Sequence, residues 1–490
     1  MMRAGTDRFK ASRERFDQLI GFVAGDARSL THAQLEDQLE VMGRELMRQL
    51  YQDHLDLRAL REEQVQVYAA GGVHHASVQE NRSRTLATVF GPVTHSRMAY
   101  RRHASHNLHP ADAALNLPVE RHSHGLRRMA AEGAARGSFD DTAAAIRRRT
   151  GAPIGKRQVE QLACRAACDV DAFYATREHE PTSDRDVLVL SVDGKGIVVL
   201  PDALRKQTAK QARSSKLATR LSKGEKRNRK RMAEVGVVYD LQPAPPRIAS
   251  DVITTTDSAE RVPAPRAKNK WLIASVVDDA AEVISQVFDE ADRRDPRRRR
   301  TRVALVDGNN HQIDRINAES TQRSTPVTVL IDFVHVAEYV WAAAWSFFDE
   351  GDPAAERWVA TRLLAILDGN ATAVATALRR AATRRKLTDK QRHNTDRCAT
   401  YLTNKAPYLD YPTALQNGWP IATGIIEGAC RHLVKDRMDI TGARWSLHGA
   451  EAILKLRAIR SNGDLDEYWT WHLNQEHQRV HAQHYDTACA

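Results

Sequence analysis

The sequence has little cysteine, few aromatic residues and no long apolar run. Five cysteines are scattered over 490 residues, an odd number that argues against a disulfide framework and favours a reducing compartment. No apolar stretch approaches the length of a membrane span, and the first residues, MMRAGTDRFKASRERFDQL, lack the apolar region of a secretory signal. We therefore expect a cytoplasmic protein with no membrane partner.

Two common families of catalytic motif are also missing. The glycines around Lys195 lack the upstream glycine and the following serine or threonine of a phosphate-binding loop. No G-x-S-x-G sequence is present to build a hydrolase nucleophile elbow. Basic charge is plentiful, since 73 Lys and Arg exceed 62 Asp and Glu for a net charge of +11. This excess, densest at 205–231, favours a polyanionic partner, although a solvated charged face is the alternative.

The N-terminal third has the pattern of two regions. Residues 1–84 are predicted to be mainly helical, with Thr31 capping a helix whose apolar residues recur at helical spacing. A pair of packed helices is favoured there over a dimerising coiled coil, because the repeat is short. Residues 85–180 begin with alternating apolar and polar residues around Gly91, which predicts a β-hairpin. The histidines of 103–124 have no nearby cysteine and are predicted to be surface residues, with zinc binding left open.

A helix-turn-helix pattern follows within 138–175. The first helix begins after Ser138, a Gly- and Pro-containing break interrupts the pattern, and a second helix begins with Lys156, Arg157 and Gln158. In helix-turn-helix proteins the first residues of the second helix contact base edges. These three residues are therefore candidate DNA contacts, and a plain helical hairpin is the alternative.

Three short apolar runs, each predicted to be a strand, are followed by an aspartate. The first reads DVLVLSVDGKG and is predicted to end at Asp193 and turn on its glycines. The others read VALVDG and VTVLIDFVH and end at Asp307 and Asp332. Because functional groups gather beyond the carboxyl ends of parallel strands, these carboxylates are expected to share one edge. Such a cluster fits Mg²⁺ or Mn²⁺, and two ions can promote phosphoryl transfer.

A later apolar helix, within GIIEGACRHLVKDRM, supplies a further acid. Arg431 and Lys435 follow Glu427 by four and eight residues, so all three are predicted to lie on one helical stripe. An acid for metal and two cations for phosphates suit a nuclease-like site, whereas an ordinary surface salt bridge is the alternative reading. Lys195 is a further candidate phosphate contact.

Several blocks together resemble bacterial insertion-sequence transposases of the DDE class, specifically the ISKra type. The blocks are VFGPVTHSR, LHPADAALNLP, HSHGLRR, SFDDTAAAIRRRTGAPIGKRQVEQL, LSVDGKGIVVLPDALR, VDGNN, IDFVHVAEYVW and GIIEGACRHLVKDRMDITGARW. The resemblance implies an RNase H-like core and a DDE triad of Asp193, Asp307 and Glu427 holding two Mg²⁺ (or Mn²⁺) ions. Asp332 and His335 resemble a D-x-x-H element of related transposases and are expected to support the site.

The resemblance also sets expectations for organisation and function. The fold class expected is α/β, with an RNase H-like catalytic core in 181–335 and 421–476, an all-helical insertion at 336–420 and a tail at 477–490. The expected function is metal-dependent DNA cleavage and strand transfer at the ends of the protein's own insertion sequence, in the bacterial cytoplasm at the nucleoid. The partners expected are double-stranded DNA, as terminal repeats and target, and further copies of the chain. A structure-selective nuclease and a catalytically inactive DNA-binding regulator are the alternatives.

Overall fold

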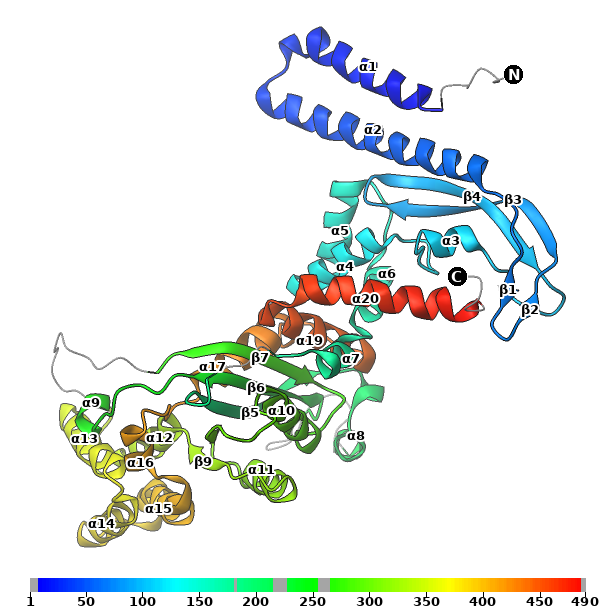
Figure 1. Cartoon of the computed structure of the whole chain (residues 1–490). Helices are drawn as coiled ribbons and strands as arrows, with labels where there is room; N and C mark the ends of the chain where they lie inside the picture. Colours follow the sequence, from blue (N-terminus) through cyan, green and yellow to red (C-terminus); the bar gives the residue numbers. More distant parts are fainter. Residues whose placement is uncertain (1–7, 180–182, 215–226, 254–264, 486–490) are drawn as a thin grey trace, which may run out of the picture. The chain divides into compact units, whose positions relative to one another are not determined.

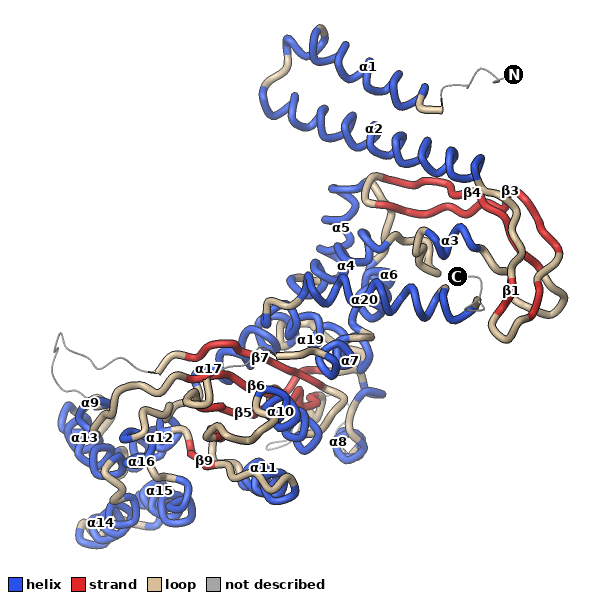
Figure 2. Tube along the Cα trace, in the orientation of Figure 1, coloured by secondary structure: helices blue, strands red, loops and turns tan. Residues whose placement is uncertain are grey.

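The computed structural model describes residues 8–179, 183–214, 227–253 and 265–485. These form a mixed α/β protein that separates into two compact units. Unit 1 combines the chain up to Thr176 with the residues from Gly463 onward, and unit 2 comprises Arg177–Asn462. The course of the chain and its strands can be followed in Figures 1 and 2. Within the described ranges, no helix has both the length and the apolar character needed to cross a membrane.

Unit 1 contains helices, two short strands and one long hairpin. In chain order its elements are α1 (Lys10–Ala24), η1 (Asp26–Ser29), α2 (His32–Arg61), β1 (Tyr68–Ala69), β2 (Val73–His74), β3 (Ser77–Thr88), β4 (Gly91–Arg101), α3 (Pro110–Ala114), α4 (His124–Arg136), α5 (Phe139–Thr150), α6 (Lys156–Ala167), α7 (Val170–Thr176), α20 (Leu465–Val480) and η5 (Ala482–His484).

The predicted pair of N-terminal helices is confirmed. Helix α2 begins where Thr31 accepts a hydrogen bond from the backbone N–H of Gln34, whose side chain caps Thr31 in return. A buried hydrogen bond connects α1 to α2: the Ser12 hydroxyl on α1 donates to the Asp53 carboxylate on α2 at 2.6 Å. This polar contact fixes the two helices against each other.

The predicted β-hairpin is also confirmed, and its turn immediately precedes Gly91. Strands β3 and β4 pair antiparallel up to Thr88 and Gly91, so the turn lies at Val89 and Phe90. The Thr88 hydroxyl donates to the Gly91 carbonyl at 2.7 Å and accepts from the Phe90 N–H, which closes the tight turn. The hairpin begins at Ser77, inside the region predicted to be helical.

Helices α5 and α6 are joined by a short turn, an arrangement that fits both the predicted helix-turn-helix and the alternative helical hairpin. Ser138 caps α5 by accepting from the Asp141 N–H at 3.0 Å, and Gly151 ends it with a φ of 69°. Helix α6 then begins after Gly155, and its apolar residues Val159 and Leu162 are buried. Helix α4 packs against both helices.

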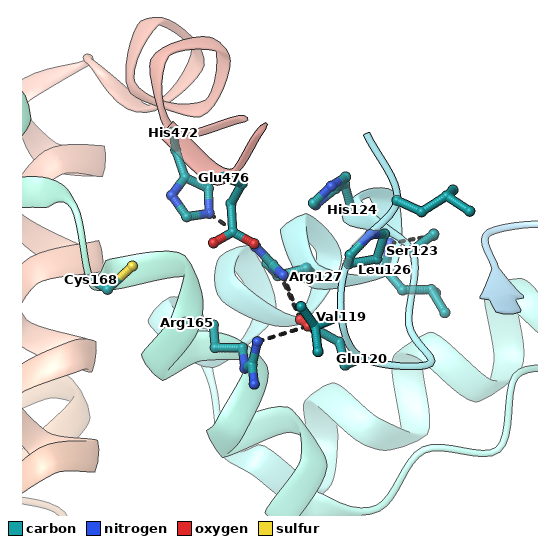
Figure 3. Close-up of polar contacts among 12 residues, drawn as sticks. Val119, Glu120, Ser123, His124, Leu126, Arg127, Arg165, Cys168, His472 and Glu476 are labelled. Carbon is teal, nitrogen blue, oxygen red and sulfur yellow. Dashed lines mark hydrogen bonds and ion pairs between the residues drawn. The ribbon is translucent and has the colours of Figure 1, made fainter. Parts of the chain in front are cut away.

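The last helix, α20, belongs to unit 1, although its sequence was predicted to divide between the last core segment and a tail. Arg127 on α4 is fully buried and donates to Glu120 on one side and to Glu476 on the other, at 2.6 Å for Glu476. Figure 3 shows this guanidinium between the two carboxylates, with Arg165 also reaching Glu120. His472 lies beside Arg127 and bonds to Asp169 outside this view. Buried charges of opposite sign therefore attach α20 to α4 and to Asp169, which precedes α7.

Unit 2 contains one sheet and the remaining helices. Its elements are β5 (Val187–Val198), η2 (Pro201–Ala203), α8 (Lys206–Arg213), β6 (Lys230–Leu241), α9 (Ala249–Val252), β7 (Ala267–Ser275), α10 (Ala280–Arg294), β8 (Arg302–Val306), α11 (Asn310–Gln322), β9 (Thr328–Ile331), α12 (Phe333–Ala344), α13 (Pro353–Leu367), α14 (Ala371–Arg384), α15 (Asp389–Lys405), η3 (Ala406–Tyr408), α16 (Tyr411–Gln416), α17 (Gly424–Ala429), η4 (Cys430–Lys435), α18 (Asp436–Met438) and α19 (Leu447–Asn462).

The sheet of unit 2 is mixed, with strand order β7-β6-β5-β8-β9. Strands β5, β6 and β7 are antiparallel neighbours, whereas β8 and β9 run parallel to β5. Helix α10 packs on the sheet over Gly236 of β6, where a Cβ would come within 2.5 Å of Val287. The Asn462 side chain pairs with both backbone groups of Leu272 and so covers the β7 edge. The helices α12 to α16 lie in sequence between β9 and α17.

The predicted end of the first core strand is wrong. Strand β5 continues through Asp193 to Val198, because β6 is equally long and pairs with it residue by residue. The glycines do not form a turn. A Cβ at Gly194 would lie 2.9 Å from Met232 and 3.0 Å from Glu234, and one at Gly196 would lie 3.1 Å from Lys230. These glycines therefore make room for β6 side chains.

Candidate functional site: an acidic row across the sheet

Three aspartates lie at one level on three neighbouring strands. The parallel ladder of β5 and β8 ends with Ser191 opposite Leu305, and two further residues on each strand bring Asp193 level with Asp307. The ladder of β8 and β9 ends with Val306 opposite Ile331, and the next residues are Asp307 and Asp332. Neighbouring strands are about 4.8 Å apart, and residues at one level point to the same face. The three carboxylates therefore form a row.

The segment that carries Glu427 contacts both ends of this row. At the β9 end, the Thr423 hydroxyl bonds to Asp332 and lies 3.1 Å from a Glu427 carboxylate oxygen. At the β5 end, the Cys430 thiol donates to Asp193 at 3.4 Å. The segment from Thr423 to Cys430, which includes Glu427, therefore contacts the two outer aspartates of the row.

Asp332, His335 and Glu427 form the tightest group of possible metal ligands in the site. One ligand atom from each lies within 4.8 Å of the other two. Asp332 is fully buried and caps α12 through the Val334 N–H at 2.6 Å, while the Thr423 N–H donates to its other oxygen at 3.0 Å. His335 is half-buried and Glu427 is exposed. The residues predicted to support the site therefore lie directly beside the predicted third acid.

Asp307 is held by its own loop and by α15. Its carboxylate accepts from the Asn309 N–H at 2.8 Å, and the Tyr401 hydroxyl donates to its carbonyl at 3.4 Å. Gly308 has a φ of 93°, and a Cβ there would come within 2.6 Å of the Tyr401 hydroxyl. Lys405, one turn after Tyr401, bonds to Asn310. Helix α15, from the helical block, therefore contributes to the surroundings of the acidic row.

The electrostatic effects around the row follow from burial and from its carboxylates. Burial raises the pKa of the Cys430 thiol, and the neighbouring Asp193 charge raises it further, so the thiol is protonated at neutral pH. Burial likewise raises the pKa of Tyr401, with Tyr339, Asp307 and Asp332 adding to the effect. Burial lowers the pKa of Lys405, and the charge of Asp307 opposes part of this lowering. The site thus holds protonated donors beside its acids.

The cations predicted to contact phosphates differ in their exposure to solvent. Arg431 and Lys435 are exposed, and Arg431 lies 3.8 Å from Asp436. They lie in η4, a π-helical turn, so the regular stripe predicted from Glu427 is interrupted after Cys430. Lys195 is half-buried within β5. Of the basic stretch at 205–231, residues 215–226 lie outside the described part of the chain.

The predicted DNA contacts at the start of α6 are all exposed. Lys156 lies 3.6 Å from Asp140, an exposed pair that leaves both side chains hydrated. The Gln158 side chain accepts from the Gly155 N–H at 3.0 Å and so serves the helix start. Among the described residues, Arg157 takes part in neither kind of contact.

A second group of possible ligands lies in unit 1 and comprises Cys168, Asp169 and His472. Here Asp169 bonds to His472 at 2.6 Å and receives two bonds from Arg479, each 3.0 Å long. Burial would raise the pKa of Asp169, but the bonds from His472 and Arg479 outweigh it and lower that pKa. The group is already neutralised by protein cations and acts as part of the α20 attachment.

Sequence reasoning missed Thr423, Cys430, Tyr401 and Lys405. Tyr401 and Lys405 are four residues apart, a spacing that places both on one face of a helix, but it does not reveal that this face meets Asp307. Thr423 precedes Glu427 by four residues and begins the same helix, which is a usable local signal.

Comparison with known proteins gives a partial similarity. No curated protein matches the chain. The matched range of the one family model found extends from the end of η1 to β6, and it includes Asp193 but neither Asp307 nor Glu427. Over residues 29–236 the chain is similar to an uncharacterised protein family, UPF0236.

Proposed function

We propose that the chain is a DDE-class transposase that cuts DNA at the ends of its own insertion sequence and joins them to target DNA. The observation that carries this proposal is the row of Asp193, Asp307 and Asp332 with Glu427 in the segment above it. Three aspartates level with one another on neighbouring strands, with a fourth acid in the segment that contacts two of them, are an expensive arrangement unless cations neutralise them.

The fold is consistent with this proposal. The five-stranded mixed sheet of unit 2 agrees with an RNase H-like core. The helices between β9 and α17 agree with an all-helical insertion before the last acid. The exposed start of α6 and the net charge of +11 suit a DNA-binding protein.

The donor set fits hard divalent cations. Asp193, Asp307 and Glu427 offer carboxylate oxygens, the ligands that Mg²⁺ and Mn²⁺ prefer. Two such ions, when bound, supply activation of a water or 3′-hydroxyl and stabilisation of the leaving oxygen. The chain's own part is to hold these acids: β5 and its partner β6 fix Asp193, and the Asn309 N–H orients Asp307.

A strand-transfer assay with Mg²⁺ on DNA carrying the element's terminal repeats tests the proposal. Asp193→Asn, Asp307→Asn and Glu427→Gln should each lower cleavage by at least ~10²-fold, since even outer-shell partners of a metal contribute ~10–100-fold. Metal-free DNA binding should be unchanged. Asp368→Asn, at the exposed end of α13, is the matched control. Wild-type cleavage by the three variants would contradict the proposal.

The same assay separates the two alternatives. A structure-selective nuclease would cut branched DNA without joining ends, and its cutting would not depend on the terminal repeats. A regulator without catalysis would bind the repeats but cut no DNA with Mg²⁺ or Mn²⁺.

A further inference from the structure

We propose that Asp332, His335 and Glu427 together form a metal site with one nitrogen and two oxygen donors that binds Mn²⁺ in preference to Mg²⁺. This inference rests on the proposed function in one respect, that Glu427 belongs to both sites. It deepens that function by assigning metal ligands in addition to Asp193, Asp307 and Glu427. The starting observation is that one donor atom of each residue lies within 4.8 Å of the others.

The separation of His335 and Asp332 suits two ligands of one ion. His335 Nδ1 lies 3.6 Å from Asp332 Oδ2, which is too long for a hydrogen bond. Two ligand atoms that are each about 2.1 Å from a shared ion are roughly 3–3.6 Å apart. The residues lie at the cap and first turn of α12, so the helix start fixes their spacing.

His335 Nδ1 has no hydrogen-bond partner although the atom is shielded from solvent. A shielded imidazole nitrogen without a partner loses the hydrogen bond that it would make with water, which is unfavourable. A metal ion between this nitrogen and the neighbouring carboxylates restores a partner. Apart from the Asp332 carboxylate oxygen 3.6 Å away, the described residues offer this nitrogen no partner.

Asp332 still has capacity for an ion after its structural bonds. A carboxylate offers about four acceptor positions. The Thr423 N–H and the Thr423 hydroxyl take two on Oδ2 and the Val334 N–H takes one on Oδ1, so the open position is on Oδ1. The Thr423 hydroxyl lies near both Asp332 and Glu427 but has only one proton to donate. The two carboxylates therefore lie close together around one hydroxyl proton, and a cation between them would offset their mutual repulsion.

The donor set decides which ion is preferred. Imidazole suits transition metals better than Mg²⁺, whereas carboxylates accept both classes. A site with one histidine and two acids should therefore bind Mn²⁺ more tightly than Mg²⁺. An ion here would hold the Glu427 carboxylate beside Asp332, the β9 member of the acidic row.

Pulsed electron paramagnetic resonance of Mn²⁺ bound to the full-length protein tests the assignment. Wild type should show coupling of the Mn²⁺ electron spin to a ligand ¹⁴N nucleus. His335→Ala and His335→Gln should abolish that coupling and weaken Mn²⁺ binding at least ~10-fold, with a smaller effect on Mg²⁺. His393→Ala, an exposed histidine on α15, should leave both unchanged. His335 is half-buried, so circular dichroism should confirm that its variants remain folded.

The outcomes distinguish this inference from the proposed function. Absence of ¹⁴N coupling in wild type, or its persistence in both His335 variants, would overturn the metal site. If cleavage still required Asp193 and Asp307, the proposed function would survive that result. Coupling that depends on His335, in a protein that neither cuts nor joins DNA, would instead support the site and contradict the function.

Discussion

Replacing Arg127 with methionine should destabilise unit 1 strongly, because it would leave two carboxylates without their shared cation. Arg127 is fully buried, and its partners Glu120 and Glu476 have side chains only 15% and 7% exposed. Removing one partner of a buried ion pair costs about 3–5 kcal/mol. Arg165 and Arg479 would still contact the two acids, so we expect the lower end, ~3 kcal/mol.

Arg128→Met is the matched control, since the residues are adjacent but differ in burial. The Arg128 side chain is 37% exposed and its partner Asp466 is 86% exposed, so this pair should contribute at most ~1 kcal/mol. Thermal unfolding followed by circular dichroism should show a loss of roughly 6–12 °C for Arg127→Met, at about 2–4 °C per kcal/mol for a domain of this size. Hydrogen exchange should show reduced protection in α20.

The effect should also depend on pH. Burial would raise the pKa of Glu476, but the bond from Arg479 and the charge of Arg127 outweigh it, so its pKa in the folded protein is lowered. A lowered carboxyl pKa stabilises the folded state above the unfolded pKa of about 4.3, and this stability is lost as the pH falls. The difference between wild type and Arg127→Met should therefore shrink below about pH 4. Equal unfolding temperatures for the Arg127 and Arg128 variants at pH 7 would refute the reasoning.

Three further predictions follow from single residues. Gly308→Ala should cost roughly 1–3 kcal/mol in thermal unfolding and reduce DNA cleavage, because the glycine has a φ of 93° and a Cβ would contact Tyr401. Burial lowers the pKa of His124 to about 4, so the folded protein should lose stability as the pH falls from about 6.5 to 4. The variant His124→Gln keeps a donor for the Asn116 carbonyl, and its unfolding temperature should depend less on pH over this range. Arg157→Ala should weaken DNA binding and reduce the salt dependence by about one released counterion in titrations at several salt concentrations.

Two of these predictions have a control residue in the chain. Gly351 has a φ of 86° and open space around it, so Gly351→Ala isolates backbone strain from side-chain contact. An equal effect of Gly308→Ala and Gly351→Ala would show that Tyr401 is not involved. An unchanged pH profile in His124→Gln would contradict the role given to that histidine. Arg28→Ala changes an exposed arginine near α2, and an identical salt slope for it and Arg157→Ala would contradict a specific DNA contact at α6.

Local patterns in the sequence predicted the elements that carry the acids. The apolar runs before Asp307 and Asp332 are strands that stop just before those residues, because the following residues begin helix caps and loops. The end of β5 was not predictable in the same way. Asp193 lies mid-strand because the distant β6 has side chains that fit against Gly194 and Gly196, which a local pattern cannot reveal.

Long-range contacts account for the other differences. The π-helical turn after Glu427 changes which residues share a face, and no residue type in GIIEGACRHLVKDRM marks that change. Helix α20 was hidden among polar and charged residues, since its buried members include His472 and Glu476, which become core residues only when paired with Arg127 and Asp169. A sequence pattern records hydrophobicity well but does not record which charges will meet.

The grouping of α20 with unit 1 has a consequence for the order in which the units fold during synthesis. All of unit 2 is made before the ribosome reaches Leu465, so its sheet and acidic row are complete while unit 1 still lacks its last helix. Until then Arg127 has Glu120 but not Glu476. On the ribosome, the unit whose synthesis begins first is therefore the one completed last.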